Sequence, residues 1–219
     1  MLSARDVGLT YGKTVALAGA SATVAEGSVV ALIGASGSGK SSLLYCLAGL
    51  LTPDTGEIRL DDVLLNNLSE DERSELRRKH FGFVFQFAEL VPELTLRENI
   101  ALPLELNGWR RADRKKRVDD LLQQLDIVEQ ADRRPVQVSG GQAQRAAVAR
   151  AIVHRPRLLF ADEPTGSLDS VNGAIVLSAM LQLAKENGTS VVLVTHDTSV
   201  AGQADEIIEM RDGRMVGSE

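Results

Sequence analysis

The sequence predicts an α/β fold with a mostly parallel core sheet covered by helices. In the last third of the chain, apolar strand-like runs at Arg157 to Ala161 and Ser190 to Thr195 alternate with a helical stretch at Val171 to Lys185. Alternation of strand and helix is typical of parallel sheets whose faces carry helices. Ser28 to Ile33 is a continuous apolar run that is too short for a helix, which indicates a further buried strand. We expect the 219 residues to form a single domain.

The amino-terminal part is expected to be an antiparallel β region. Met1 to Tyr11 and Thr14 to Val24 have strand-like alternation and are separated by a short turn, and Glu26-Gly27 forms the next turn. Ser41 to Leu51 then carries a helical pattern, which Thr52-Pro53-Asp54 ends.

The middle of the chain is predicted to be more helical. Ser69 to Lys79 begins with a capping box and reads as a helix, and Phe81 to Gln86 reads as a strand. Thr95 to Gly108 also begins with a capping box, and the apolar spacing of Arg110 to Leu125 predicts an amphipathic helix. This part lacks further strand patterns, so we expect a helical subdomain at about residues 87–137, inserted into the sheet.

Two further elements complete the predicted order. Gln142 to His154 is expected to form a helix, and the helix at Val171 to Lys185 is expected to end at Asn187-Gly188. Near the carboxyl terminus, Glu206 to Met210 and Arg214 to Val216 flank a short turn sequence, which predicts a hairpin.

Composition excludes several classes of protein. Lys plus Arg total 24 and Asp plus Glu total 30, so the net charge is −6, which argues against general nucleic-acid binding. Cys46 is the one cysteine, so an intrachain disulfide is impossible. The apolar runs are far shorter than the roughly 20 residues that span a bilayer. Met1 to Thr10 contains Arg5 and Asp6 and lacks the apolar core of a signal peptide.

A glycine-rich loop follows the strand that ends at Ile33. It fits the pattern G-x-x-x-x-G-K-[ST] and consists of Gly34, Ala35, Ser36, Gly37, Ser38, Gly39, Lys40 and Ser41. Glycines let successive backbone N–H groups curl around a polyphosphate, and the following helix adds the positive end of its dipole. We expect Lys40 to reach the β- and γ-phosphates and the Ser41 hydroxyl to bind Mg²⁺. The loop therefore predicts nucleotide binding.

Two acids end the apolar strand near residue 160. An acid at this end of a strand lies beside the phosphates in an open α/β sheet. We expect Asp162 to hold Mg²⁺, often through water, and Glu163 to orient or deprotonate an attacking water. Without the glycine-rich loop, such a pair would more often be a helix cap or a solvated turn.

Two other predicted strands also end in polar residues. Gln86 offers a side-chain oxygen for Mg²⁺ and an amide for water, and His196 could donate to the γ-phosphate. Alone, Gln86 would be an ordinary polar residue and His196 a turn or cap residue. Because parallel strands end at one edge of a sheet, Gly34, Asp162 and His196 are expected to lie along that edge.

Ser139-Gly140-Gly141-Gln142 predicts a second anion-binding helix start. Ser139 and Gln142 form a capping box, whereas two glycines in a first turn weaken a helix by about 1 kcal/mol each relative to alanine. The glycines are explained if a ligand approaches the helix start closely, and an anion is the natural guest. A second phosphate site in one chain suggests that two chains share each nucleotide.

In combination, these features resemble the ATP-binding subunit of an ABC transporter, a P-loop NTPase. The matching segments, in chain order, are Tyr11 (the aromatic that stacks on adenine), Gly34 to Ser41 (Walker A), Gln86 (Q-loop), Val138 to Gln142 (signature), Leu158 to Glu163 (Walker B), Ser167-Leu168-Asp169 (D-loop) and His196 (switch histidine). By itself, Tyr11 would read as a half-buried strand aromatic. Ser42 stands where threonine is common and keeps a hydroxyl, and Val138 replaces the usual leucine. These departures leave an active ATPase expected.

The resemblance implies a mechanism that the residues alone only suggest. Two copies would pack head to tail as a homodimer and trap two ATP molecules with Mg²⁺. Each ATP would lie between the Walker A loop of one copy and Ser139 to Gln142 of the other, with Ser42 and Asp169 among the implied nucleotide contacts. Hydrolysis would reopen the dimer and drive an integral-membrane permease at the cytoplasmic face of the membrane. The segment after Gln86 would carry the contacts with the permease.

Several short segments of the sequence resemble one branch of the family in particular. The ATPases of lipoprotein release, macrolide and peptide export and haem export have similar segments at Phe81 to Gln86, Glu98-Asn99 and Leu102-Pro103-Leu104. The segment from Asp162 to Asp169 also resembles this branch, although Ser167 stands where asparagine is commoner. The branch implies export or extraction of a hydrophobic or amphipathic substrate, whose identity is not readable from this chain.

Other interpretations are weighed against this one. A DNA-repair ATPase would carry a long coiled coil between Lys40 and Ser139, and this chain has no long heptad run there. A ribosome-acting ABC protein would carry two cassettes, whereas this sequence has one loop of the kind at Gly34 to Ser41. Both classes of protein are therefore disfavoured. A soluble ABC ATPase of cofactor or cluster assembly stays open and differs only in its partner. The basic run at Arg110 to Arg117 reads as the solvated face of a helix, with contact to anionic lipid headgroups as the alternative.

Overall fold

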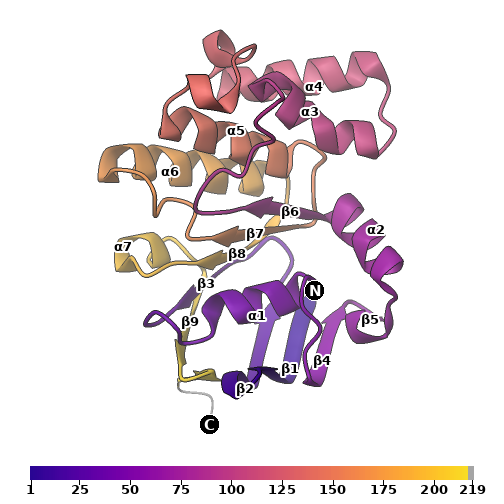
Figure 1. Ribbon diagram of the computed structural model, residues 1–219, viewed down its shortest axis with the longest axis vertical. Helices are drawn as coiled ribbons and strands as arrows, with labels where there is room; N and C mark the ends of the chain where they lie inside the picture. Colours follow the sequence, from indigo (N-terminus) through magenta and orange to yellow (C-terminus); the bar gives the residue numbers. More distant parts are fainter. Residues whose placement is uncertain (217–219) are drawn as a thin grey trace. The chain divides into compact units, whose positions relative to one another are not determined.

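The computed structural model describes residues 1–216 of the chain, which divides into two compact units. The first unit comprises Met1–Arg77 and the chain from Ser190 onward, and the second comprises Arg78–Thr189. Figure 1 gives the course of the chain and the labels of its helices and strands. The helical subdomain expected at about residues 87–137 contains the helices α3 (Leu96–Leu106) and α4 (Arg111–Gln124) and no strand, and its bounds remain a prediction.

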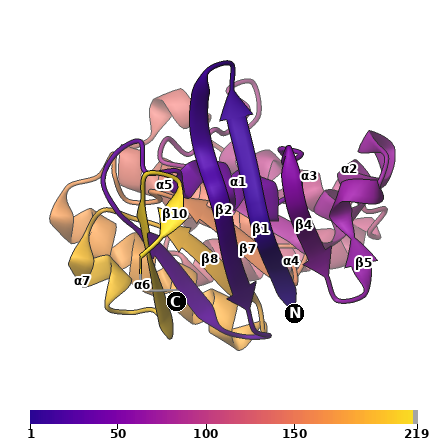
Figure 2. The same ribbon diagram turned by 90° about the horizontal axis from the view of Figure 1, so that it is seen from below.

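The first unit contains an antiparallel sheet with the strand order β2-β1-β4-β5. Its strands are β1 (Leu2–Tyr11), β2 (Thr14–Val24), β4 (Thr55–Leu60) and β5 (Val63–Leu64). Leu2, Ala4, Val7 and Leu9 of β1 are buried, so one face of the sheet supplies core. Figure 2 shows β1, β2 and β4 side by side. The predicted antiparallel pair β1 and β2 is confirmed, whereas β4 and β5 were not predicted.

The first unit also contains the strands that lead to the glycine-rich loop. β3 (Val29–Ile33) lies between β8 (Ser190–Val194) and β9 (Glu206–Arg211) and is parallel to both, and β10 (Arg214–Met215) is antiparallel to β9. Every residue of β8 is buried, as expected for a strand covered on both faces. The predicted parallel strands and the carboxyl-terminal hairpin are confirmed.

The helix α1 (Lys40–Leu47) follows the loop and packs on β1, β2 and β8. It is shorter than the predicted Ser41 to Leu51, because Gly49 takes a positive φ of 63° and the turn closes there. Cys46 on α1 is buried, and burial raises the pKa of its thiol to about 12. A one-turn helix, α7 (Thr198–Ala201), follows β8 and packs on β3.

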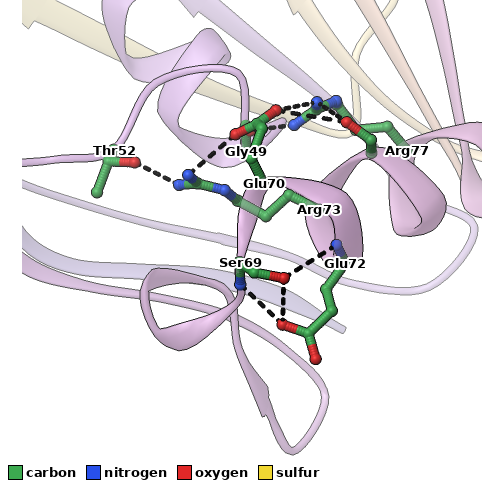
Figure 3. A network of polar contacts seen from close by, with 8 residues as sticks. Gly49, Thr52, Ser69, Glu70, Glu72, Arg73 and Arg77 are labelled. Carbon is green, nitrogen blue, oxygen red and sulfur yellow. Dashed lines mark hydrogen bonds and ion pairs between the residues drawn. The ribbon is translucent and has the colours of Figure 1, made fainter.

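The helix α2 (Glu70–His80) is attached mainly by polar contacts, because none of its residues is buried. Arg77 donates to the backbone oxygen of Gly49 at 2.6 Å and pairs with Glu70 at 2.6 Å. Arg73 also pairs with Glu70, at 3.0 Å, and donates to the hydroxyl of Thr52 (Figure 3). These arginines tie α2 to the turn that follows α1.

The second unit combines a parallel strand pair with four helices. The strands are β6 (Phe81–Val84) and β7 (Leu158–Asp162), and the helices are α3 (Leu96–Leu106), α4 (Arg111–Gln124), α5 (Gly140–Ile152) and α6 (Ser170–Glu186). Short 3₁₀ turns lie at Leu65–Asn67 in the first unit and at Val128–Gln130 and Pro135–Gln137 in the second. α5 packs against α3, α4, α6 and β6, so it is the central helix of this unit (Figure 1).

Small residues allow this close packing of α5. Ala146, Ala147 and Ala149 are completely buried, and a Cβ atom at Gly82 of β6 would come within 2.1 Å of the backbone oxygen of Ala151. The backbones of β6 and α5 therefore touch, and a side chain at residue 82 would force them apart.

The capping boxes that the sequence predicted are all present. Ser69, Thr95 and Ser139 each accept a hydrogen bond from the backbone N–H three residues later, and the side chain of that later residue accepts from the backbone of the first. These pairs fix the starts of α2, α3 and α5. Among residues 1–216, no helix is both long enough and apolar enough to cross a membrane.

Candidate active site

The glycine-rich loop joins the end of β3 to the start of α1, as the sequence predicted. Gly34, Gly37 and Gly39 have φ values of 142°, 78° and 101°, which lie in the region that favours glycine. A Cβ atom at Gly34 would come within 2.2 Å of the backbone oxygen of Met210, and one at Gly39 within 2.4 Å of that of Ala16. Side chains at these two positions are therefore excluded both by conformation and by space.

Polar groups of the loop point inward and suit an anion. Lys40 is only 6% exposed, and its Nζ donates to the backbone oxygens of Gly34 at 2.9 Å and Ala35 at 2.8 Å. The Oγ of Ser38 is buried and has no hydrogen-bond partner among the described residues. A buried hydroxyl without a partner is costly unless a ligand completes it. A cavity of about 300 Å³ borders the loop from Gly34 to Ser38 and the segment from Glu209 to Asp212.

His196 lies at the same sheet edge as the loop. β3 and β8 are parallel and pair Leu32 with Val194, and the backbone N–H of Thr195 donates to the oxygen of Leu32 at 3.1 Å. The residues that follow these strands, Gly34 and His196, thus leave the sheet at one edge. His196 is exposed, so its ring is accessible to a ligand.

Tyr11 ends β1 and pairs with Thr14 across the first hairpin. It is 52% exposed, which agrees with the interpretation as a half-buried strand aromatic and leaves part of the side chain accessible. An exposed ring of this kind offers a face on which a flat base can stack. Its role as the adenine contact remains a prediction.

The second unit brings Gln86 and Glu163 together. β6 and β7 are parallel and pair Val84 with Ala161, so both side chains follow adjacent strand ends. A Cβ atom at Gly166 would lie 3.0 Å from Gln86 Nε2 and 3.3 Å from Glu163 Oε2, so the two polar ends converge beside this glycine. Glu163 has a φ of 46°, a conformation uncommon for residues other than glycine and often found at functional sites.

Strand β6 ends at Val84, two residues earlier than predicted. The physical reason is that the backbone oxygen of Phe85 accepts a hydrogen bond from the side chain of Gln144, at 2.7 Å, in place of a strand partner. Gln86 therefore belongs to a loop and not to the strand.

The oxygen donors predicted for Mg²⁺ have suitable chemistry. They are the hydroxyl of Ser41, the amide oxygen of Gln86 and the carboxylate of Asp162, and hard oxygen ligands of this kind are preferred by Mg²⁺. Within the second unit, Asp162 is the last residue of β7, and Gln86 follows β6, the strand that pairs with β7. No cluster of three or more metal-binding His, Cys, Asp or Glu side chains occurs among residues 1–216.

The glycine pair of the signature segment lies at the start of α5. Ser139 caps the helix by accepting from the backbone N–H of Gln142 at 3.3 Å, and Gln142 Oε1 accepts from the N–H of Ser139 at 3.0 Å. Ser139 and Gly140 are exposed. A Cβ atom at Gly141 would lie 3.3 Å from Asn172 Oδ1, so the start of α6 supplies a packing reason for this glycine that the sequence did not reveal.

Asp169 is the cap of α6. Its Oδ1 accepts from the backbone N–H groups of Val171 at 3.1 Å and Asn172 at 3.0 Å, and its Oδ2 accepts from the side chain of Asn172 at 2.6 Å. The hydrogen bonds from Asn172 and Val171 lower the pKa of the Asp169 carboxyl. This carboxylate shapes the turn after Glu163, and a contact of Asp169 with nucleotide remains a prediction.

Gln144, Arg150 and Ser167 were missed as site residues, although their side chains hold the loop that contains Gln86. Ser167 Oγ donates to the backbone oxygen of Gln86 at 2.7 Å, and Arg150 donates to the oxygens of the residues that follow. One signal was available: Gln144 falls on the helix face that carries the buried Ala147, Val148 and Ala151. A lone amide on an apolar face indicates specific polar partners.

The family is decided by comparison with known proteins. The sequence profile of a family described as "ABC transporter" matches residues 17–166. The chain belongs to the ABC transporter family. It is 45% identical over 201 residues to the lipoprotein-releasing system ATP-binding protein LolD of Aquifex aeolicus, an alignment that covers 92% of this chain and 89% of that protein.

Two other relatives agree with the branch that the sequence resembled. This ABC ATPase is 45% identical over 200 residues to the macrolide export ATP-binding/permease protein MacB 1 of Aeromonas hydrophila, covering 91% of this chain and 31% of that protein. The solved dimeric structure of the ATP-binding cassette MJ0796, in a post-hydrolysis state bound to ADP and Pi, superposes with a TM-score of 0.91 at 38% identity, over 99% of this chain and 97% of that one. The predicted family, branch and fold class are confirmed, and the chain is an ATP-binding ABC-type ATP hydrolase.

Replacing Lys40 by alanine should weaken ATP binding. The ammonium lies inside the phosphate loop, and hydrogen bonds to charged groups contribute about 1.5–3 kcal/mol, which corresponds to at least about a tenfold rise in Kd. Titration with a fluorescent ATP analogue measures this affinity, and a thermal melt checks that the variant is folded. Lys185→Ala, which removes an exposed lysine from α6, is the control. A Kd near that of the unaltered chain would contradict the role of Lys40.

Proposed function

We propose that this chain is the ATP-hydrolysing subunit of a transport complex, in which ATP-driven closure and reopening of a homodimer powers a separate membrane permease. The convergence of Gln86 and Glu163 beside Gly166 carries the enzymatic part of the proposal. The phosphate loop, with its inward-pointing Lys40 and Ser38, supports nucleotide binding.

Each of the predicted site residues has a defined role in this proposal. Lys40 and the backbone N–H groups of its loop bind the β- and γ-phosphates, and Tyr11 stacks on the base. Ser41, Asp162 and Gln86 hold Mg²⁺, which neutralises phosphate charge when bound.

The groups nearest the reacting phosphate are Glu163 and His196. Glu163 orients the attacking water and accepts its proton, because a carboxylate at this strand end is within reach of the γ-phosphate in α/β nucleotide sites. His196 donates a hydrogen bond to the γ-phosphate, where negative charge accumulates during transfer.

A second copy of the chain completes each site in the proposal. Ser139, Gly140 and Gly141 are placed at the exposed start of α5, where N–H groups and the helix dipole favour a phosphate. MJ0796 was solved as a dimer, which supports the same arrangement for this chain.

The permease follows from the relatives and from one exposed aromatic. MacB 1 is named as an ATP-binding/permease protein and LolD as the ATP-binding protein of a lipoprotein-releasing system, which supports a membrane permease as the partner of this chain. Phe87 is 68% exposed in the loop directly after Gln86 and offers an apolar contact for that subunit. Since LolD is named for lipoprotein release and MacB for macrolide export, the substrate is proposed to be hydrophobic or amphipathic and the chain to act at the cytoplasmic face of the membrane.

Replacing Glu163 by glutamine should abolish turnover and keep ATP binding. Glutamine has nearly the same shape but cannot accept the proton, and loss of such a base typically costs at least about a hundredfold in rate. ATP should then trap a dimer that size-exclusion chromatography detects. Glu129→Gln removes an exposed carboxylate from the same unit and should hydrolyse ATP normally. Unaltered turnover in Glu163→Gln would remove Glu163 from the reaction.

Placing arginine at Ser139 should prevent that dimer from forming. The bulky cation would occupy the exposed helix start where the partner's phosphate is proposed to bind. In the Glu163→Gln background, Ser139→Arg should bind ATP as a monomer, whereas Ser178→Arg, on the exposed face of α6, should still form the trapped dimer. Normal dimers in Ser139→Arg would show that the signature does not complete the second site.

A pull-down tests the permease directly. Tagged Glu163→Gln chain, incubated with ATP and Mg²⁺ in gently solubilised membranes of its source cell, should retain a membrane protein in stoichiometric amount. Lys40→Ala serves as the control for capture that does not depend on nucleotide. Recovery of a soluble partner alone would replace the permease by a cofactor- or cluster-assembly role, and the ATPase site would be unaffected.

A further inference from the structure

The loop after β6 is held by side chains through its backbone. Gln144 of α5 bonds on both sides of Gln86: its Nε2 donates to the oxygen of Phe85 at 2.7 Å, and its Oε1 accepts from the N–H of Ala88 at 2.9 Å. The same Nε2 donates to the backbone oxygen of Pro164, the residue after Glu163, at 2.8 Å.

We propose that Gln144 is a positioning residue for ATP hydrolysis, which sets the geometry of Gln86 and Glu163 through these three hydrogen bonds. The inference rests on the proposed roles of those two residues. Gln144 touches neither nucleotide nor water in this proposal and acts through the backbone on which the two reacting side chains are mounted.

The hydrogen-bonding capacity of Gln144 matches its surroundings. Both N–H groups of the amide are used by the two carbonyls, and the amide oxygen has a donor. The side chain is 1% exposed, so water cannot replace any of these bonds. A buried amide is unfavourable unless it is fully bonded, and a fully bonded one holds its partners in a single arrangement.

Arg150 and Ser167 reinforce the same loop. Arg150 Nη2 donates to the oxygen of Ala88 at 3.1 Å and its Nη1 to that of Glu89 at 2.8 Å, and Ser167 Oγ donates to that of Gln86 at 2.7 Å. Side chains thus bond the backbone carbonyls of Phe85, Gln86, Ala88 and Glu89, while Phe87 remains exposed.

The position of Gln144 near the start of α5 places it close to the signature glycines. α5 begins at the capping residue Ser139, so Gln144 is little more than one turn from the signature glycines. One rigid helix therefore carries the segment proposed to bind the partner's nucleotide and the amide that aligns Gln86 and Glu163. Small displacements of reacting groups are costly, since misplacement by about 1 Å can slow a reaction about a hundredfold.

The test replaces Gln144 by methionine, which has a similar volume but neither donates nor accepts a strong hydrogen bond. We expect turnover of ATP to fall at least tenfold and the Kd for nucleotide to change less than twofold. The split is expected because the three bonds of Gln144 go to residues of the second unit, whereas Lys40 and its loop belong to the first. Gln144→Glu, which keeps the acceptor for Ala88 but cannot donate to the two carbonyls, should also lose turnover.

Asn99→Leu is the matched control. Asn99 is completely buried in the same unit, and its amide likewise bonds backbone groups, at Val91, Leu94 and Thr95, away from Gln86 and Glu163. It should lower the melting temperature as Gln144→Met does and retain turnover within twofold when both are assayed well below their melting temperatures. Equal loss of turnover in Asn99→Leu would attribute the effect to general destabilisation and overturn the inference.

Amide hydrogen exchange in the unaltered chain gives a reading that needs no variant. The N–H of Ala88 should exchange as slowly as core amides, because its acceptor is buried, and Gln144→Met should release it. Fast exchange at Ala88 in the unaltered chain, or turnover within twofold in both Gln144 variants, would overturn the inference. If Glu163→Gln also turns over ATP normally, the proposed site itself fails, and normal turnover in the Gln144 variants alone removes only the positioning role.

Discussion

Parallel strand pairing is the constraint on which the functional geometry depends. In the first unit, the pairing of β3 with β8 sends the phosphate loop and His196 out of the sheet at one edge. In the second unit, the pairing of β6 with β7 does the same for Gln86 and Asp162. A slip of either register by one residue would exchange the buried and outward faces of a strand and would move the polar residue that follows it.

Close backbone approach then fixes the loops that leave these edges. At Gly34 and Gly39 the neighbouring carbonyls of Met210 and Ala16 occupy the space of a side chain, and Lys40 bonds the carbonyls of Gly34 and Ala35, so backbone approach and one side chain together hold the phosphate loop. Such a loop presents its N–H groups in a fixed arrangement, and less ordering is needed when an anion binds. Gly166 has the matching role in the second unit, because it leaves room for Gln86 and Glu163 to meet.

The sequence predicted the elements whose pattern is local and strong. The buried strands β3, β7 and β8 are short apolar runs, and the starts of α2, α3 and α5 carry capping boxes, so each was placed within a few residues. The strand β4 was missed because Thr55–Leu60 contains only two large apolar residues and pairs with β1 far away in the chain. Such pairing depends on contacts that no local pattern encodes.

The residues of the candidate site also differ in whether a local sequence pattern predicts their role. The spacing of compact motifs was enough to propose Lys40 and Glu163 as ligand-contacting residues, and the structure places Lys40 inside the glycine-rich loop and Glu163 beside Gln86. The role of Asp169 as the cap of α6 is local as well, because its carboxylate accepts from residues two and three positions later, but it was not predicted. The close approach of Gly141 to Asn172 could not be predicted, because it depends on how α5 meets α6. Gln144 lies between these cases: its place on an apolar helix face was visible, but its partners at residues 85, 88 and 164 come from two distant segments.

The loop that Gln144 holds has a fixed backbone and an exposed aromatic side chain. Its backbone is bonded to α5 on both sides of Gln86, yet Phe87 between those bonds projects its ring into solvent. A side chain on a flexible loop could be moved by a partner without consequence for its neighbours. Here the backbone of Phe87 lies between two residues that are bonded to Gln144, so under the proposed function a permease that shifts this backbone would strain the bonds on both sides of Gln86. Contact with the membrane partner and alignment of the hydrolytic residues would then be one mechanical event.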